Sequence, residues 1–257
     1  MPSAREPQQI YEETRREGRR RLARPPLELA ATALVGGFDV AVGVIAYGLA
    51  QRSVDGPAGD LVGAIAFGIG FVFIVVGRSE LFTENFLIPV AGLERRNRRS
   101  WLKLGELWLV ALVVNIVGGV IVAIIVTSHA VLPDGTGKPL VALAEHIVHR
   151  STLPALLSAL IAGALMTVMT WFVEGAADSI GVRIVMAWVT GAIIALGAFN
   201  HAIVSTLELV FGMRYGADVD VSQVLANLAV AVGGNLAGGL MFVTFVRSVQ
   251  AAENAGD

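Results

Sequence analysis

The chain has 257 residues, of which 55% are hydrophobic and 16% are charged, and its mean hydropathy is +0.69. A soluble domain has about 25% charged residues, so the composition excludes a soluble globular protein and indicates an integral membrane protein. The formal net charge of −2 is uninformative by itself. Because the chain has no cysteine, a disulfide framework, a thiolate metal site and a cysteine nucleophile are also excluded.

The first 26 residues are polar and rich in arginine, and Pro25 and Pro26 mark where a surface helix must end. This segment is not a signal peptide, because the apolar run behind it is long enough to span a membrane and ends in no small-residue cleavage site. We expect 1–26 to be a cytoplasmic N-terminal segment and 248–257 to be a short cytoplasmic tail.

Six apolar runs between these ends are long enough to cross a hydrocarbon core of about 30 Å. The sequence therefore predicts an all-α membrane protein with six transmembrane helices and one transport domain, 27–247. The runs lie near residues 27–50, 59–90, 105–128, 153–174, 183–211 and 222–247.

Lysine and arginine residues are distributed unequally between the two sides of this bundle. The N-terminal segment, the connection after the second span, Arg183 and Arg247 together hold 14 of them, and the opposite side holds 4. The positive-inside rule then predicts cytoplasmic N- and C-termini. A nucleic-acid-binding tail would explain the arginine run but not the asymmetry of the loops, so no nucleic-acid partner is expected. Anionic lipid is a possible partner of the tail.

The second and fifth spans are interrupted by polar residues. The stretch IVVGRSELFTENFLIPV (74–90) contains several polar and charged side chains, and the fifth span contains Asn200 and His201. Non-helical backbone at membrane depth must be buried in protein or line an aqueous cavity, and an ionisable residue there is a candidate for function. Two broken spans therefore indicate a pathway, with His201 as its candidate central residue.

The two halves of the chain resemble each other. NIVGG begins at Asn115 and NLAGG begins at Asn235, an offset of 120, while Thr83 and His201 at the two breaks are 118 apart. Three spans per half force the second copy to enter from the opposite side. This pattern predicts an inverted 3+3 repeat, about 27–128 and 153–247, with its site at the midplane. The paired glycines are interpreted as helix-packing residues.

Five stretches in order resemble the signatures of the formate/nitrite transporter family, over about 27–247. The resemblance implies an aquaporin-like protomer, a homopentamer, and one pore per protomer for small monovalent anions of weak acids, in a bacterial inner membrane. The stretches are GGFDVAVG (36–43), ELFTEN (80–85), WLVALVVNIVGG (108–119), AFNHAIVS (198–205) and NLAVAVGGNLAGG (227–239).

The resemblance also assigns roles to single residues. His201 matches the family's central pore histidine, and Thr83 matches the threonine of the loop that approaches it. Phe67 and Leu81 match apolar constriction positions, while Asn115 and Asn235 match helix-contact positions. A bare anion in a narrow apolar pore has a desolvation penalty of many kcal/mol, so it must be neutralised there. Imidazole, with an ordinary pKa near 6.5, makes proton exchange feasible.

Several positions depart from the family pattern and indicate a divergent branch. Asn200 stands where the family usually has glutamate before the histidine, and the family's asparagine on helix four is missing near Ala164–Thr167. Arg78 stands where a small residue is usual, and Asp39 adds an acid to the first helix.

Arg78 has two interpretations. A buried arginine is rarely unpaired, so we expect an ion pair with Asp39, Glu80 or Glu174 that holds the broken helix. Alternatively, Arg78 raises the anion concentration at the pore mouth. The Glu80 carboxylate is expected to accept hydrogen bonds from freed amides of its own loop.

The sequence thus predicts a channel for formate, nitrite or hydrosulfide that acts by protonation at His201. A pore for neutral small solutes and a non-conducting scaffold with a basic tail remain alternatives. No enzyme is expected, because Walker, H-E-x-x-H and G-x-S-x-G motifs are absent. No cofactor and no metal are expected either, since His146 and His149 have no third ligand near them in sequence.

Overall fold

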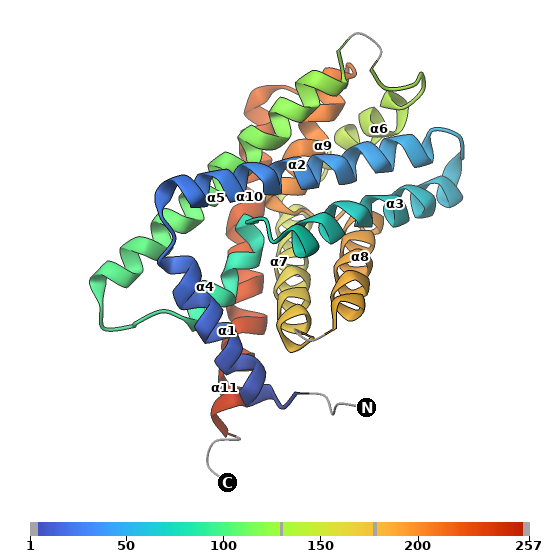
Figure 1. The fold of residues 1–257 in the computed structure, drawn as a ribbon. Helices are drawn as coiled ribbons and strands as arrows, with labels where there is room; N and C mark the ends of the chain where they lie inside the picture. The colour runs from blue at the N-terminus through green and yellow to red at the C-terminus, as the bar shows by residue number, and fades with distance from the viewer. Residues whose placement is uncertain (1–4, 129–130, 177–178, 254–257) are drawn as a thin grey trace.

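The computed structural model describes residues 5–128, 131–176 and 179–253, and within these ranges it contains helices and no β-strand (Figure 1). The outermost parts of both expected terminal segments, 1–4 and 254–257, lie outside the described residues. The elements are α1 (Pro7–Leu22), α2 (Pro26–Gln51), α3 (Gly56–Gly77), η1 (Phe82–Phe86), α4 (Ile88–Ala91), α5 (Arg98–Val126), α6 (Gly137–Val148), α7 (Thr152–Gly175), α8 (Ile180–Leu196), α9 (Ala202–Arg214), α10 (Val221–Ala237), η2 (Gly238–Phe245) and α11 (Val246–Glu253).

Five of the predicted spans are found as helices long and apolar enough to cross a membrane. They are α2, α3, α5, α7 and the continuous run from α10 into α11. The second predicted span, 59–90, is not one helix. It consists of α3, which ends at Gly77, and the short elements η1 and α4. The fifth is divided into α8, with 17 residues, and α9, with 13. The predicted interruptions of spans two and five are thus confirmed.

The two breaks have the same backbone geometry. Arg78, after α3, has φ 57°, and Ala198, after α8, has φ 43°; each is a non-glycine residue in the left-handed region. In each break the next amide bonds five residues back, from Ser79 to Ile74 at 3.2 Å and from Phe199 to Ile194 at 2.9 Å. Such bonds satisfy terminal carbonyls of a helix that cannot continue.

Asn115 on α5 holds the first break in place. Its Oδ1 accepts a hydrogen bond from the backbone N–H of Phe82 at 2.9 Å. Its Nδ2 donates to the carbonyls of Ala33 at 2.7 Å and Glu80 at 2.8 Å. Freed backbone groups that would otherwise be unpaired inside the membrane are therefore satisfied by one fully buried side chain.

Asn235 on α10 does the same for the second break. Its Oδ1 accepts from the N–H of Ala202 at 2.8 Å, and its Nδ2 donates to the carbonyls of Ala159 at 2.8 Å and Asn200 at 2.9 Å. The helix-contact positions implied for Asn115 and Asn235 are therefore present in this fold, with matching partners in the two halves.

These contacts define the register of the repeat. Asn115 and Asn235 are 120 residues apart, and so are their partners Glu80 and Asn200. With this offset His201 corresponds to Leu81. The near match of Thr83 with His201, 118 residues apart, is therefore not the repeat register, and these two residues meet across the repeats instead.

The paired glycines allow close helix contacts, as predicted. A Cβ on Gly118 would overlap the Leu34 carbonyl oxygen on α2, and a Cβ on Gly238 would overlap the Leu160 carbonyl oxygen on α7. These helices can approach only because both positions lack a side chain.

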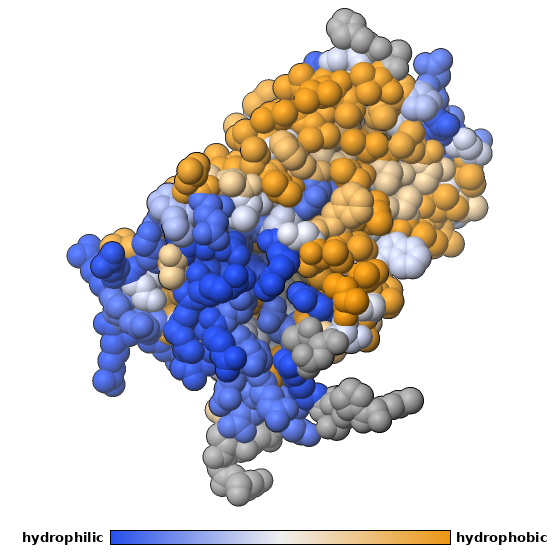
Figure 2. Space-filling model, in the orientation of Figure 1, coloured by the Kyte–Doolittle hydropathy of each residue, from blue (hydrophilic) through white to orange (hydrophobic). Residues whose placement is uncertain are grey.

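The N-terminal helix α1 lies against α4, α11 and α7, so the first and last described helices lie at the same side of the molecule (Figure 1). In Figure 2 hydrophilic side chains gather over this side, and hydrophobic side chains cover the helices beyond it. The exposed apolar surface includes Leu109 on α5 and Trp188 on α8. Such a belt is what a helix bundle presents to lipid or to neighbouring subunits.

Candidate pore site

His201 is the N-cap residue of α9. Its Nδ1 accepts a hydrogen bond from the N–H of Val204 at 3.2 Å, and its own N–H donates to the Ser205 hydroxyl at 3.1 Å. The side chain is 0% exposed. Capping explains why the chain positions an imidazole at the break, since first-turn amides have no helical partner.

The other nitrogen of this imidazole contacts the first half of the chain. His201 Nε2 lies 2.7 Å from Thr83 Oγ1, and Thr83, in η1, is also 0% exposed. Because Nδ1 is an acceptor, neutral His201 has its proton on Nε2 and donates it to Thr83. The threonine hydroxyl proton is then left for a further acceptor. The structure therefore brings together the two residues that the sequence selected.

Two phenylalanine rings follow this polar pair along α3. The Phe71 ring centroid lies 6.0 Å from that of His201 and 5.7 Å from that of Phe67. Phe67, Phe71 and Leu81 are all 0% exposed. Phe71 was missed in the sequence analysis; its position four residues after Phe67, on the same face of α3, was the available signal.

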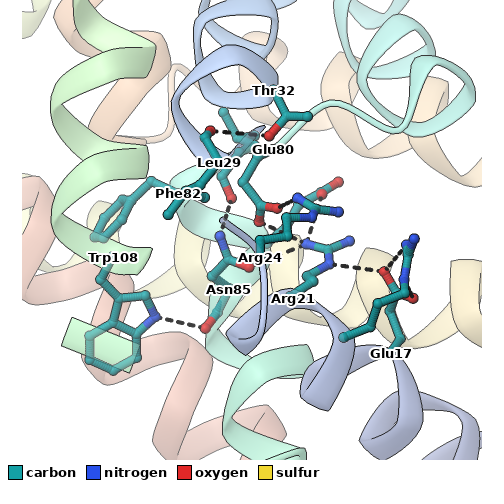
Figure 3. Close-up of polar contacts among 12 residues, drawn as sticks. Glu17, Arg21, Arg24, Leu29, Thr32, Glu80, Phe82, Asn85 and Trp108 are labelled. Carbon is teal, nitrogen blue, oxygen red and sulfur yellow. Dashed lines mark hydrogen bonds and ion pairs between the residues drawn. The ribbon is translucent and has the colours of Figure 1, made fainter. Parts of the chain in front are cut away.

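Glu80, at the first break, is bound by two arginines, one on α1 and one in the turn between α1 and α2 (Figure 3). Arg21 donates to Glu80 at 3.0 Å, and Arg24 forms a second ion pair with the same carboxylate. The Glu80 side chain is 0% exposed, and those of Arg21 and Arg24 are 12% and 8% exposed. The interpretation of Glu80 as an acceptor for its own loop's amides was therefore wrong, because the N-terminal segment supplies its partners.

The same network extends to neighbouring residues. Arg21 also donates to Asn85 Oδ1 at 3.2 Å and lies 3.4 Å from Glu17 (Figure 3). Burial acts to raise the pKa of Glu17, but the hydrogen bond from Arg20 and the charges of Arg20 and Arg21 lower that pKa overall. Glu17 is therefore a carboxylate that helps to hold Arg20 and Arg21.

The ion pair expected for Arg78 is not formed. Arg78 is exposed, and its guanidinium has no acid within 4.0 Å among the described residues. Asp39 instead accepts a hydrogen bond from the Ser79 hydroxyl at 2.5 Å. The physical reason is that Arg78 ends α3 in a left-handed conformation and its side chain lines an open cavity, while Glu80 already has two cations.

Asn200 is 2% exposed and contacts α10. Its Oδ1 accepts a hydrogen bond from Asn227 Nδ2 at 3.1 Å, and its backbone N–H donates to Ser158 at 3.0 Å. Its Nδ2 has no hydrogen-bond partner among the described residues. Asn200 thus supports the break next to His201 without a contact between the two side chains.

A cavity of about 40 Å³ lies on the α1 side of the first break. Cations and acids both line it, among them Arg78, Arg183, Glu84 and Glu174. A second pocket, of about 300 Å³, lies beside the second break and is lined by Tyr47, His146 and the end of α8. A cavity with polar residues in its lining therefore lies beside each of the two breaks.

The described residues contain no cluster of three potential His, Cys, Asp or Glu metal ligands. His146 Nε2 lies 3.1 Å from the Arg150 guanidinium, and His149 Nδ1 lies 2.7 Å from the Glu145 carbonyl. Both histidines of this pair thus have other contacts.

Two broken helices that meet at a buried histidine, inside a bundle with an apolar belt, define a helical membrane channel or transporter built from inverted repeats. A family model described as formate/nitrite transporter matches residues 8–249. The chain therefore belongs to the formate/nitrite transporter family. The family is one of transporters, so the match indicates transport and not catalysis.

Curated relatives agree with this assignment. The chain is 27% identical to the inner membrane protein YfdC of Escherichia coli over 248 residues, covering 94% of this chain and 77% of that protein. It is 24% identical to the formate channel FocA of Haemophilus influenzae over 233 residues, covering 80% of this chain and 81% of that protein.

Solved structures share the fold, which is aquaporin-like. An FNT family ion channel superposes with a TM-score of 0.79 at 18% identity, covering 94% of this chain and 98% of the other. A pentameric formate channel with formate bound superposes with a TM-score of 0.73 at 21% identity, covering 87% and 96%.

Proposed function

We propose that this protein conducts small monovalent anions of weak acids, of the formate, nitrite and hydrosulfide class, and that each anion crosses the centre of the pore with a proton. The observation that carries this proposal is the hydrogen bond between Thr83 and His201, both fully buried, with the Phe71 ring beside the imidazole. Membership in the formate/nitrite transporter family supports the substrate class.

The surroundings of the pair favour neutral species. Phe67, Phe71 and Leu81 are proposed as the constriction, and they offer no hydrogen bond to a passing ion. An unpaired anion there would have a penalty of many kcal/mol, whereas a neutral weak acid loses far less on desolvation. A proton must therefore join the anion before or at this point.

Thr83 and His201 can supply that proton. Nε2–H of His201 donates to Thr83 Oγ1, and the Thr83 hydroxyl can donate to an anion oxygen or sulfur. Transfer starts from the imidazolium: the Thr83 proton passes to the anion, the Nε2 proton replaces it on Oγ1, and neutral imidazole with its proton on Nδ1 remains. A proton taken up from the vestibule then restores the imidazolium. Imidazole is suited to this exchange because its ordinary pKa lies near neutrality.

The vestibules have a proposed role in attracting anions. Arg78 is exposed at the mouth of the α1-side cavity without an acid within 4.0 Å among the described residues, and Arg183 lines the same cavity. Their charges would raise the local anion concentration. The interpretation of Arg78 as part of the pore mouth thus replaces that of a structural ion pair.

We further propose the wider organisation expected from the sequence: cytoplasmic termini in an inner membrane, a transport domain at 27–247 between segments 1–26 and 248–257, and a homopentamer. The excess of arginine on the α1 side supports the orientation. The pentameric state of the superposed formate channel and the exposed apolar faces of this chain support the assembly.

The test is formate or nitrite flux in proteoliposomes as a function of pH. We expect His201→Phe to abolish the pH-dependent flux, because phenylalanine fills the site without a proton to exchange. Asn227→Leu is the matched control, since it changes a polar contact near the second break without touching the imidazole. Unchanged flux in His201→Phe would refute the mechanism.

The alternatives predict other outcomes. A neutral-solute pore would conduct water or ammonia with no competition from formate or nitrite. A non-conducting scaffold would show no flux for any anion in the intact protein.

A further inference from the structure

A pocket on the outer side of α1 is separate from the pore site. It has a volume of about 400 Å³ and lies between the C-terminal end of α1, the turn after α4 and the first turns of α5. Its lining includes Arg19, Arg99 and Lys103, with Glu94 as the one acid among the lining residues. The pocket is thus cationic.

The cations in this pocket differ in how they are engaged. Arg19 and Arg99 are exposed, and neither side chain forms an ion pair within 4.0 Å among the described residues. Lys103 is bonded to Glu106 at 2.7 Å, and Glu94 accepts a hydrogen bond from Asn97 at 2.8 Å. Arg19 and Arg99 are therefore the two charges available to a bound anion.

The position of the pocket at the edge of the apolar surface limits the kind of anion. Trp101 and Leu102, directly after Arg99 and Ser100, are 52% and 62% exposed, and Trp101 Nε1 donates to the Arg95 carbonyl at 3.0 Å. Exposed tryptophan beside basic residues is typical of the membrane interface. Farther along α5, Leu109 continues the apolar surface.

We propose that this pocket binds the head group of an anionic phospholipid. The phosphate would lie between Arg19 and Arg99, and the acyl chains would follow Trp101 and Leu102 along α5. Basic pockets at the cytoplasmic edge of membrane helices are suited to such head groups. A free soluble anion would use the charges but would gain nothing from the adjoining apolar surface.

The site joins α1 to the bundle. Gly18 on α1 packs on the backbone of α4 and of Gly92, and Gly92 itself lines the pocket. Arg19 and Arg21 are two positions apart on one helix, so they project on nearly opposite faces. Arg19 reaches the pocket while Arg21 binds Glu80 at the first break. A bound head group would therefore hold in place the helix that contacts the broken span.

The test is native mass spectrometry of the intact protein with palmitoyl-oleoyl-phosphatidylglycerol as the probe and the matching phosphatidylcholine as the neutral reference. The double variant Arg19→Gln/Arg99→Gln removes the two available charges. At about 1 kcal/mol per basic residue, we expect binding roughly 10- to 30-fold weaker than in the wild type.

The matched control is Arg96→Gln/Arg98→Gln, which makes the same change in net charge at and just before the start of α5, outside the pocket lining. Its affinity should stay close to that of the wild type, and Arg19→Lys/Arg99→Lys should retain most of the binding, which excludes misfolding as the cause. Equal losses in both glutamine variants would overturn the site, as would a wild type with no preference for phosphatidylglycerol. Displacement of the lipid by millimolar inorganic phosphate would overturn the choice of a lipid. None of these outcomes depends on anion flux.

Discussion

Replacing Glu80 with glutamine is predicted to detach α1 from the first break. The carboxylate is fully buried, and its loss leaves the Arg21 and Arg24 guanidiniums, 12% and 8% exposed, without their main partner. Removing one member of a buried pair costs about 3–5 kcal/mol. Arg21 keeps Glu17 at 3.4 Å and Arg24 keeps Glu28 at 3.6 Å, so the lower end of that range applies.

Hydrogen–deuterium exchange over 7–24 measures this directly. About 3 kcal/mol corresponds to a roughly 100-fold larger population of the detached helix, and exchange there should accelerate accordingly. The control is Glu28→Gln, because that carboxylate is 56% exposed and its pair with Arg24 should contribute little. The triple variant with Arg21→Gln, Arg24→Gln and Glu80→Gln should lose less than the sum of its parts, since the buried carboxylate and its two arginine partners are removed together. Unchanged exchange in Glu80→Gln, or strictly additive losses, would refute the reasoning.

Three further predictions concern the pore pair, the repeat and acid. Thr83→Val leaves His201 Nε2 without its acceptor, and an unpaired buried group costs about 1–3 kcal/mol, so anion flux should fall about 10- to 100-fold. Thr83→Ser keeps a hydroxyl and should keep most of the flux. Equal flux in the valine and serine variants would contradict the relay. Asn115→Ala and Asn235→Ala each remove three buried hydrogen bonds, so each should destabilise the protein by about 2–4 kcal/mol in denaturant unfolding. A marked difference between the two variants would contradict equivalent roles of the two asparagines at the two breaks. The folded-state pKa of Glu17 is lowered, so its contribution to stability is complete above the ordinary carboxyl pKa of about 4.5 and is lost as the pH falls below it. The protection factors of α1, which correct for the slower intrinsic exchange at lower pH, should therefore fall on acidification, and less so in Glu17→Gln.

The spans and their breaks could be predicted because local sequence determines them. Length and hydropathy locate the helices, and polar residues inside an apolar run require internal partners. The residue that ends α3 shows the limit of this reasoning. Arg78 was expected to be buried and paired, but a left-handed φ of 57° turns the chain, and its side chain is exposed at a cavity.

Long-range pairing could not be predicted from the sequence. Glu80 is bound by arginines 56 and 59 residues earlier, in a segment whose composition indicated only a solvated surface helix. Many acids and arginines are available in this chain, and nothing in their spacing selects this pairing. The Thr83–His201 contact was accessible only through the family resemblance, because the repeat register of 120 pairs His201 with Leu81.

The most direct test of the account is the ratio of protons to anions moved by the wild-type protein. Formate uptake and luminal pH can be recorded together in proteoliposomes clamped at zero membrane potential. The account predicts one proton entering with each formate, which acidifies the lumen, and no current attributable to formate. Formate uptake that carries current and leaves luminal pH unchanged would contradict it, because the anion would then cross the apolar constriction as a bare charge.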